Sequence, residues 1–405
     1  MNVPDGAWRR TLWMMVSVQA VMSLAFSISA PFLPLFVIQL GVHPMAAVDL
    51  WSGAIASVSF LLAAIFSPIW GSLADRVGRK AMVVRSSAAV CLFTAVMGLA
   101  PNVLVLFLAR ASMGVFSGFS AAATALVGTQ VPEGMLGFSL GWMATGQLVG
   151  GLLGPIAGGV LADWLHDYRA VFFWTSGVAF CASLLCTLAV RERFTRPDAG
   201  GGVRGPIWRQ FGELLRHPQL APMFAVVMLA QVSAFGVQPI VPLFVRDLVG
   251  NAPWLATAAG AAFAVTGLAD LIGSPFLGKR SDVIGYRRVL TISLLGVAVF
   301  TIPQALVHSI WAFLALRFGV GIFLGGVLPT ANAWIGTMFP VERRGQVYGV
   351  VASATFMGMF IGPLLGGALA ARFGFATVFV TFGTLTLANL SWVLLGVRER
   401  TALTA

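Results

Sequence analysis

The stretch Gly71-Ser-Leu-Ala-Asp-Arg-Val-Gly-Arg-Lys80 joins two long apolar runs, and an altered copy follows at Gly278-Lys-Arg-Ser-Asp-Val-Ile-Gly-Tyr-Arg287. Both copies keep the first glycine, the aspartate and the second glycine at the same spacing. The offset, from Gly71 to Gly278, is about half of a chain of 405 residues. A charged loop that recurs at half the chain length is typical of an internal repeat. The sequence therefore predicts two homologous halves.

The composition is that of a membrane protein. Hydrophobic residues make up 58% of the chain and charged residues 10%, whereas soluble domains carry about a quarter charged residues. A helix needs roughly 20 apolar residues to span a bilayer, and the alternating pattern of membrane strands is absent. We therefore expect an all-α membrane protein with twelve transmembrane helices. The predicted spans are approximately 12–40, 50–71, 82–100, 102–125, 136–162, 169–191, 221–246, 254–277, 289–307, 309–333, 345–371 and 374–397.

Basic residues are distributed unequally between the predicted loops. With a cytoplasmic N-terminus, all but five of the 25 lysines and arginines fall in cytoplasmic segments. The exceptions are Arg169, Arg246 and Arg372 outside, and Arg110 and Arg317 within spans. This asymmetry follows the positive-inside rule, so both termini are expected in the cytoplasm. It also accounts for the net charge of +11 without a nucleic-acid partner, because a basic inner surface faces the lipid bilayer.

The repeat extends to further pairs of segments and defines the domains. The matched segments are Pro31–Val37 with Pro239–Val245, Arg110, Gly114 and Gly118 with Arg317, Gly321 and Gly325, and Gly150–Gly159 with Gly358–Gly367. Between the halves lies a polar stretch with three consecutive glycines, which is typical of a linker. We predict an N-terminal six-helix bundle at 1–191, a cytoplasmic linker at 192–219 and a C-terminal six-helix bundle at 220–405.

Three of these segments carry a family resemblance that covers essentially the whole chain. Gly71–Lys80 resembles the signature of the major facilitator superfamily in the loop between its second and third spans. Arg110 with Gly114 and Gly118 is similar to its fourth-span motif, and Gly150–Gly159 resembles the fifth-span motif of its drug:proton antiporters with twelve spans. The resemblance implies the major facilitator fold, in which two pseudo-symmetric six-helix bundles surround a central cavity.

The resemblance also implies that the two charged loops form a conformational latch. Asp75 would meet the start of the eleventh span, just after Glu342–Arg344, where the dipole of the helix favours a carboxylate. The glycines would allow a tight turn. A loop that only fixes the membrane topology is the alternative. The expected latch residues are Gly71, Asp75, Arg76, Gly78, Arg79, Lys80, Gly278, Asp282, Gly285 and Arg287.

The glycine- and proline-rich spans are candidates for gating. Glycines four residues apart allow close helix packing, and a proline inside a helix removes one backbone hydrogen bond. We expect these spans to form a sliding seam, although ordinary close packing would produce much of the same pattern. The gating candidates are Gly150, Gly154, Pro155, Gly158, Gly159, Gly358, Gly362, Pro363, Gly366 and Gly367.

Ionisable residues within spans are the candidates for coupling and substrate binding. Asp270 is the one acid well inside a span, about 12 Å before Gly278 by helical rise, and could carry a proton or bridge neighbouring spans. Arg110 and Arg317 occupy equivalent positions without a neighbouring acid. They would make the cavity electropositive, or would only hydrogen-bond backbone carbonyls. The coupling candidates are Asp270, Arg110 and Arg317, and the cavity candidates are Gln19, Phe26, Arg110, Gln231, Phe235, Gln238, Arg317, Asn332 and Trp334.

Together these features predict a secondary active transporter. We expect proton-coupled multidrug efflux by alternating access, with export of amphipathic small molecules, anionic ones included. The expected partners are the substrate, protons and the lipid bilayer, and the expected form is a multi-pass monomer in the bacterial inner membrane. No cofactor, metal or enzymatic activity is expected. An exporter of sugars or other metabolites is one alternative, and a non-transporting receptor or scaffold, which predicts a large additional soluble domain, is another.

Overall fold

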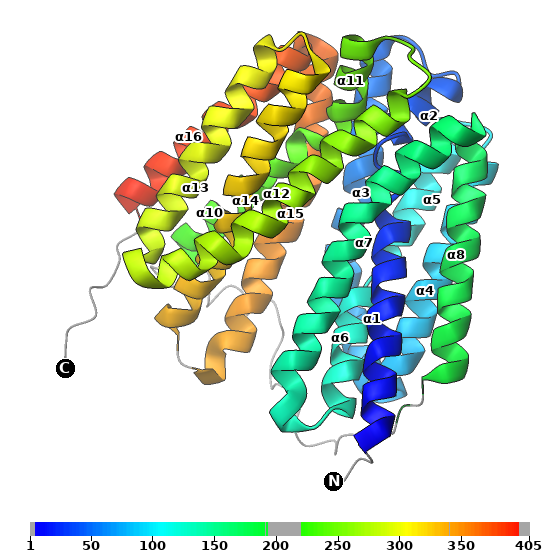
Figure 1. Cartoon of the computed structure of the whole chain (residues 1–405), viewed down its shortest axis with the longest axis vertical. Helices are drawn as coiled ribbons and strands as arrows, with labels where there is room; N and C mark the ends of the chain where they lie inside the picture. The colour runs from blue at the N-terminus through cyan, green and yellow to red at the C-terminus, as the bar shows by residue number, and fades with distance from the viewer. Residues whose placement is uncertain (1–4, 191, 193–219, 340, 397–405) are drawn as a thin grey trace. The chain divides into compact units, whose positions relative to one another are not determined.

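The computed structural model describes residues 5–190, 192, 220–339 and 341–396, and every regular element within them is a helix (Figure 1). The prediction of an all-α fold is confirmed. The helices are α1 Asp5–Ser27, α2 Leu33–Gln39, α3 Met45–Val77, α4 Arg79–Leu99, α5 Val103–Val115, α6 Phe119–Gln130, η1 Glu133–Met135, α7 Leu136–Leu165, α8 Tyr168–Ala189, α10 Leu220–Gly236, η2 Gln238–Ile240, α11 Val241–Val249, α12 Leu255–Ile284, α13 Tyr286–Thr301, η3 Ile302–Leu306, α14 Ile310–Met338, α15 Val341–Phe373 and α16 Phe375–Gly396.

These elements correspond to the predicted spans in order. Among the described residues, eleven helical segments are long and apolar enough to cross a membrane. The first predicted span corresponds to α1 and α2. It is not among the eleven because Arg10, Gln19 and several serines interrupt the apolar residues of α1. Several helices run beyond the predicted spans, and α3 and α12 include most of the two charged stretches that were expected as loops.

Three predicted spans are discontinuous. The first breaks between α1 and α2, and the seventh between α10 and α11, each close to the prolines of the Pro31–Val37 and Pro239–Val245 segments. Proline cannot donate a backbone hydrogen bond, which explains both breaks. The fourth span breaks between α5 and α6, where no proline lies.

The chain divides into two compact units, and α3, α11 and α12 each contribute to both. One unit consists of Met1–Pro44, Val58–Gly202 and Val245–Ala264, and the other of Met45–Ser57, Val203–Phe244 and Val265–Ala405. The bundle boundaries inferred from the repeat, 1–191 and 220–405, stay a prediction. Apart from Glu192, the predicted linker 192–219 lies outside the described residues.

Glycines bring paired helices into close contact within each unit. In the first unit α1 packs along α7, and a Cβ atom at Gly154 would lie 2.9 Å from the carbonyl oxygen of Leu24 (Figure 1). In the second unit α10 packs along α15, and a Cβ atom at Gly362 would lie 2.6 Å from the carbonyl oxygen of Val232. A larger side chain at either position would push the helices apart.

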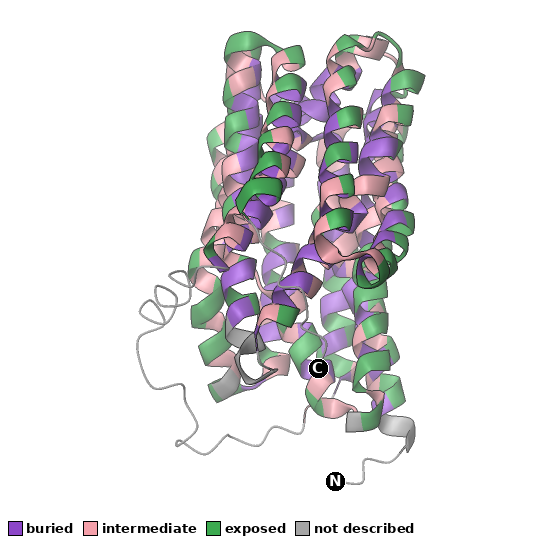
Figure 2. Ribbon diagram, turned by 90° about the vertical axis from the view of Figure 1, so that its left-hand side faces the viewer, coloured by how far each residue is buried: buried purple, intermediate pink, exposed green. Residues whose placement is uncertain are grey.

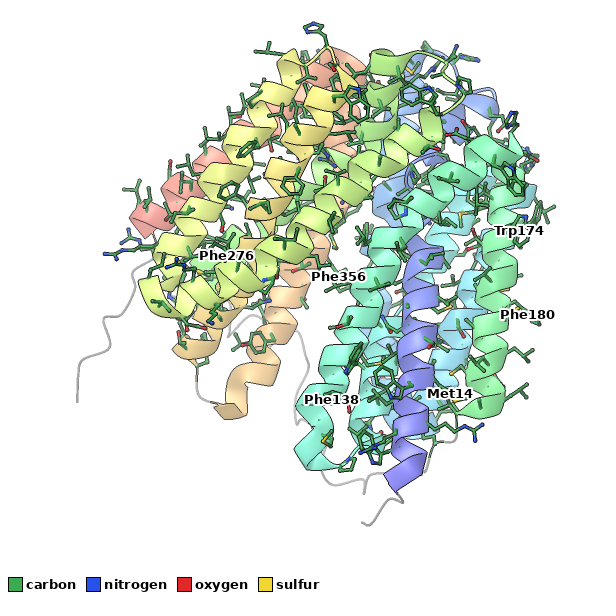
Figure 3. All side chains as sticks on the ribbon, in the orientation of Figure 1. Met14, Phe138, Trp174, Phe180, Phe276 and Phe356 are labelled. Atoms are coloured by element: carbon green, nitrogen blue, oxygen red, sulfur yellow. The ribbon has the colours of Figure 1, made fainter. Side chains whose placement is uncertain are left out.

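Apolar side chains also cover the outer faces of the helices, as lipid contact requires. Figure 2 shows exposed residues along the outer faces and buried residues between the helices of each unit. Trp174 and Phe180 project outward from α8 and are 58% and 56% exposed (Figure 3). In a soluble protein an apolar surface of this kind would mark an interface. In this chain it agrees with the eleven helical segments, among the described residues, that are long and apolar enough to cross a membrane.

Candidate functional site

The two copies of the opening stretch share one backbone geometry. Gly78 separates α3 from α4 with a φ of 104°, and Gly285 separates α12 from α13 with a φ of 96°. Other residues rarely adopt this conformation, which explains why glycine occurs at both positions. Gly71 and Gly278 lie inside α3 and α12, with no close contact at Gly71, and Arg76 is exposed near the end of α3.

The cations after these glycines bind the ends of neighbouring helices within their own units. Lys80 Nζ donates to the carbonyl oxygen of Thr187 at 2.8 Å, and Arg287 donates to the carbonyl oxygen of Leu394. Glu192 accepts from the backbone nitrogens of Arg79 and Lys80, each at 2.9 Å. Glu192 therefore caps the N-terminus of α4, a role that was not predicted for it.

Of the two aspartates in the repeated stretch, Asp282 is described by the structure. Asp282 is exposed and accepts a hydrogen bond from the Tyr286 hydroxyl at 3.1 Å, within its own segment. The side chains of Asp75 and of Glu342–Arg344 lie outside the described residues. The latch between Asp75 and the start of α15 therefore stays a prediction.

Asp270 belongs to α12, and its side chain lies beside α14 in the second unit. The side chain is half-buried, and a Cβ atom at Gly325 of α14 would lie 2.8 Å from its Oδ1 atom. Within the described residues, the carboxyl group accepts no hydrogen bond and forms no ion pair. The absence of a larger residue at position 325 leaves room for this carboxyl group.

Arg110 and Arg317 are buried, at 9% and 6% exposure. The Arg110 guanidinium lies 5.3 Å from the ring centroid of Phe26, and its one hydrogen-bond contact is with the sulfur of Met113 at 3.9 Å. The Arg317 guanidinium lies 6.0 Å from the ring centroid of Phe313. In the described part of the chain neither guanidinium donates to a backbone carbonyl or a carboxylate, and both Nε atoms are buried without a partner.

A polar cluster lies in the first unit, and part of it was missed. Gln19 Nε2 donates to the Ser120 hydroxyl at 2.7 Å and to Gln147 Oε1 at 3.5 Å, and Ser23 donates to the carbonyl oxygen of Gln147 at 2.7 Å. The Oε1 atom of Gln19 is buried without a hydrogen-bond donor in the described residues. The short side chain of Ser120 gave no signal of its own in the sequence.

The remaining cavity candidates lie at separate places in the second unit. Gln231 is buried, with its Cβ beside Gly358, and Gln238 is half-buried in η2. The carbonyl oxygen of Asn332 accepts from the Tyr348 hydroxyl at 3.3 Å. Trp334 is 2% exposed and belongs to the apolar core around α10 and α15, so its ring packs helices together. Phe235 is half-buried at the end of α10.

The gating candidates divide into two groups by what they contact. In their own unit, the glycines at 150, 154, 158, 358, 362 and 366 face α1, the residue Ile28 that follows it, or α10, which is ordinary close packing of helix pairs. Gly159 instead lies against the backbone of Ala256 and Thr257, and the Pro155 carbonyl lies against Gly260. In the other unit Gly367 and Pro363 make the corresponding contacts with α3, at Asp49 and Gly53. These second contacts join α7 to α12 and α15 to α3.

Asp163 caps the N-terminus of α12 at this contact. Its two carboxylate oxygens accept from the backbone nitrogens of Ala256 at 3.1 Å and Thr257 at 2.7 Å, all within the first unit. A carboxylate at a helix N-terminus satisfies free N–H groups and interacts favourably with the dipole. Asp163 lay at the end of a predicted span and was not singled out. The sequence did hold a signal for Asp163: the equivalent position in the second half is Ala371, so the acid occurs in one half of the repeat and not in the other.

Replacing Asp163 with alanine should loosen the start of α12. The loss of a cap typically costs about 1 kcal/mol, so amide exchange over residues 254–260 should rise roughly fivefold. Hydrogen–deuterium exchange measures this directly. Asp167→Ala is the matched control, because Asp167 caps α8 through the backbone nitrogen of Arg169 at 2.8 Å. It should affect the start of α8 alone, and equal exchange at 254–260 in both variants would contradict the assignment.

In the part of the chain that the structure describes, eleven helical segments long and apolar enough to cross a membrane indicate a multi-pass membrane protein. The chain belongs to the Major Facilitator Superfamily, whose family model matches residues 15–258 and 223–404. This confirms the resemblance inferred from Gly71–Lys80.

Curated relatives are similar over nearly the whole chain. The chain is 37% identical to "Multidrug resistance protein MdtG" of Dickeya zeae (strain Ech586), over 97% of this chain and 96% of that protein. It is 37% identical to the protein of the same name from Enterobacter lignolyticus (strain SCF1), over 98% and 94%. A solved bacterial homologue of the human lysosomal transporter Spinster, inward-facing and occupied, has a TM-score of 0.78 at 15% identity, over 98% of this chain and 97% of that one. At this identity the last comparison bears on the fold alone.

Proposed function

We propose that this protein is a proton-coupled exporter of amphipathic molecules that works by alternating access. The observation that carries the proposal is a set of charged groups inside the spans that have no oppositely charged partner among the described residues: Asp270 on α12, Arg110 on α5 and Arg317 on α14. Ionisable groups inside a membrane are costly and usually mark a transport pathway. The full-length similarity to proteins named for multidrug resistance supports the export of drug-like cargo.

Asp270 is the proposed proton carrier. A carboxyl group that lacks a basic partner can gain a proton and become neutral without leaving another charge uncompensated. A proton drives transport only if protonation favours one conformation over the other. Arg317 lies on α14 eight residues before Gly325, the residue beside the carboxyl group, which is an axial separation of roughly 12 Å along the helix. Arg317 is therefore proposed to influence the electric field around the carboxyl group without pairing with it.

Arg110 is the proposed contact for an anionic or zwitterionic part of the cargo. The alternative that it serves only to bind backbone carbonyls has no support, since the described residues offer it none. Phe26, at 36% exposure, supplies an aromatic face beside the guanidinium, and Gln19, Ser120 and Gln147 supply polar contacts. Apolar surfaces with a few polar groups suit loosely specific binding.

The loops at Gly71–Lys80 and Gly278–Arg287 are proposed to stabilise one conformation of the cycle. The contacts of α7 with α12 and of α15 with α3 are proposed to hold these helices together while the conformation changes.

The distribution of basic residues supports cytoplasmic termini in a bacterial inner membrane. We propose that the transporter acts as a monomer.

A susceptibility panel in an efflux-deficient bacterium tests the proposal. Cells that produce the protein should tolerate higher concentrations of several acidic or zwitterionic amphiphiles, and the protection should weaken as the external pH rises and the inward proton gradient falls. The same cells carrying an empty vector are the control. Unchanged susceptibility to every compound, in the presence of membrane-inserted protein, would contradict drug export and favour a metabolite exporter.

A further inference from the structure

The fourth span is broken in the first half of the repeat and continuous in the second. α5 ends at Val115, α6 begins at Phe119, and Gly118 between them has a φ of 105°. The equivalent helix α14 runs unbroken from Ile310 to Met338, although it contains Pro329. The broken span has no proline, so another cause must hold it open.

Two side chains from neighbouring spans bind the carbonyl groups at the break. Trp70 Nε1, on α3, donates to the carbonyl oxygen of Val115 at 2.7 Å. Arg85 Nη2, on α4, donates to the carbonyl oxygens of Ser117 at 2.9 Å and Phe116 at 3.5 Å. The Arg85 guanidinium lies 3.5 Å from the ring centroid of Trp70. A carbonyl group without a donor is costly within a membrane span, and these two side chains supply donors to the three carbonyl groups of the break.

The repeat provides an internal comparison. Phe116 stacks on Phe93 with centroids 5.8 Å apart, and the equivalent pair Phe323 and Phe300 stacks at the same 5.8 Å. The aromatic pair is therefore common to both halves and does not cause the break. The positions equivalent to Trp70 and Arg85 are Leu277 and Ile292, whose side chains have no N–H group. The break occurs in the half that has the two donors.

The glycine in the fourth span is kept in the two halves for different reasons. A Cβ atom at Gly118 would approach only Arg85 Nη2, at 3.9 Å, so the requirement there is the positive φ. A Cβ atom at Gly325 would lie 2.6 Å from the backbone nitrogen of Ser274, so the requirement there is space. Gly118→Ala therefore acts on the backbone of the break with little effect on packing.

The break separates two residues of the candidate binding surface. Arg110 lies on α5, before it, and Ser120 lies on α6, after it, where Ser120 accepts from Gln19. A continuous helix would turn α6 about its axis relative to α5 and would move Ser120 away from Gln19. We infer that Trp70 and Arg85 are positioning residues, which hold the fourth span open at Phe116–Gly118 so that Arg110 and Ser120 are presented together. The effect on transport rests on the proposed function, whereas the effect on the helix does not.

A pair of spin labels across the break tests the inference. The labels replace Leu108 of α5 and Thr124 of α6, both exposed, in a full-length background with serine at the positions of Cys91, Cys181 and Cys186. The double variant Trp70→Leu/Arg85→Ile gives the first half the residues of the second. The interlabel distance measured by double electron–electron resonance should shift toward about 24 Å, the length of sixteen residues of continuous helix. Export by the same variant, without labels, should fall at least tenfold.

Two further variants make the test specific. Arg372→Ile removes an exposed arginine that lies 5.6 Å from the ring centroid of Phe373 and lies outside the proposed latch and binding surface, and it should leave both the distance and the export rate as in the parent. Arg85→Lys retains a donor for the Ser117 carbonyl and should retain the parent distance. If the double variant fails to fold, Gly118→Ala and Trp70→Phe, which removes only the N–H group, take its place.

The two parts of the inference fail separately. An unchanged distance in the double variant would overturn the role of Trp70 and Arg85, whether or not the protein exports drugs. A shifted distance with undiminished export would overturn the functional role of the break.

Discussion

Asp270→Asn is expected to abolish proton-driven substrate uptake into inside-out membrane vesicles, to the level of vesicles without the protein. Asparagine has the shape of the protonated acid but cannot release a proton. Because Asp270 has no basic partner among the described residues, the substitution leaves no opposite charge stranded. Substrate exchange without a proton gradient should stay within about twofold of the parent, since binding and conformational change do not require the proton.

The split between these two readouts distinguishes coupling from damage to the fold. Asp247→Asn, which changes an exposed carboxylate on α11, is the matched control and should keep both activities. Loss of exchange together with uptake would point to a structural role for Asp270, such as a bridge between α12 and α14. Full retention of proton-driven uptake would show that another group carries the proton.

Arg110→Gln is expected to reduce the export of acidic substrates by about ten- to a hundredfold, and to leave cationic dyes little affected. A hydrogen bond to a charged group contributes about 1.5–3 kcal/mol, which corresponds to this range. The buried position of Arg110, with no counter-ion in the described residues, means that an anion from the cargo would be its first charged partner. Concentration-dependent transport of one acidic and one cationic compound measures the difference.

Two comparisons give the Arg110 prediction its specificity. Arg110→Lys keeps the positive charge and should keep most of the preference for acids. Arg372→Gln removes an exposed arginine 5.6 Å from the ring centroid of Phe373 and should leave the export of both compounds unchanged. An equal loss for acidic and cationic compounds in Arg110→Gln would count against anion recognition.

The fold could be predicted from the sequence because it depends on two repeated patterns, the apolar runs and the paired glycines. Apolar runs located the eleven described helical segments that are long and apolar enough to cross a membrane. The paired glycines located the turns at Gly78 and Gly285, where the backbone has a positive φ. The buried arginines were also visible, since a charge within an apolar run is conspicuous in any sequence.

Side-chain contacts between residues far apart in the chain could not be predicted from the sequence. Asp163 and Glu192 act by capping helices that begin 92 residues later, at Leu255, and 113 residues earlier, at Arg79. A capping acid within four residues of its helix has a local signature, but one from another span does not. The same holds for Trp70 and Arg85, whose carbonyl partners lie on another span. The signal that the sequence held for them is the difference between the two halves at these positions, which are Leu277 and Ile292 in the second half.

Accumulation of an acidic amphiphile by the purified protein in liposomes tests the central claim most directly. With the liposome interior acidic, the outward movement of protons should drive uptake of the compound above its external concentration, and a protonophore should abolish that accumulation. Liposomes containing the Asp270→Asn variant should only equilibrate. Accumulation that is unaffected by the protonophore, or equally strong in the variant, would contradict an exporter coupled to protons through Asp270.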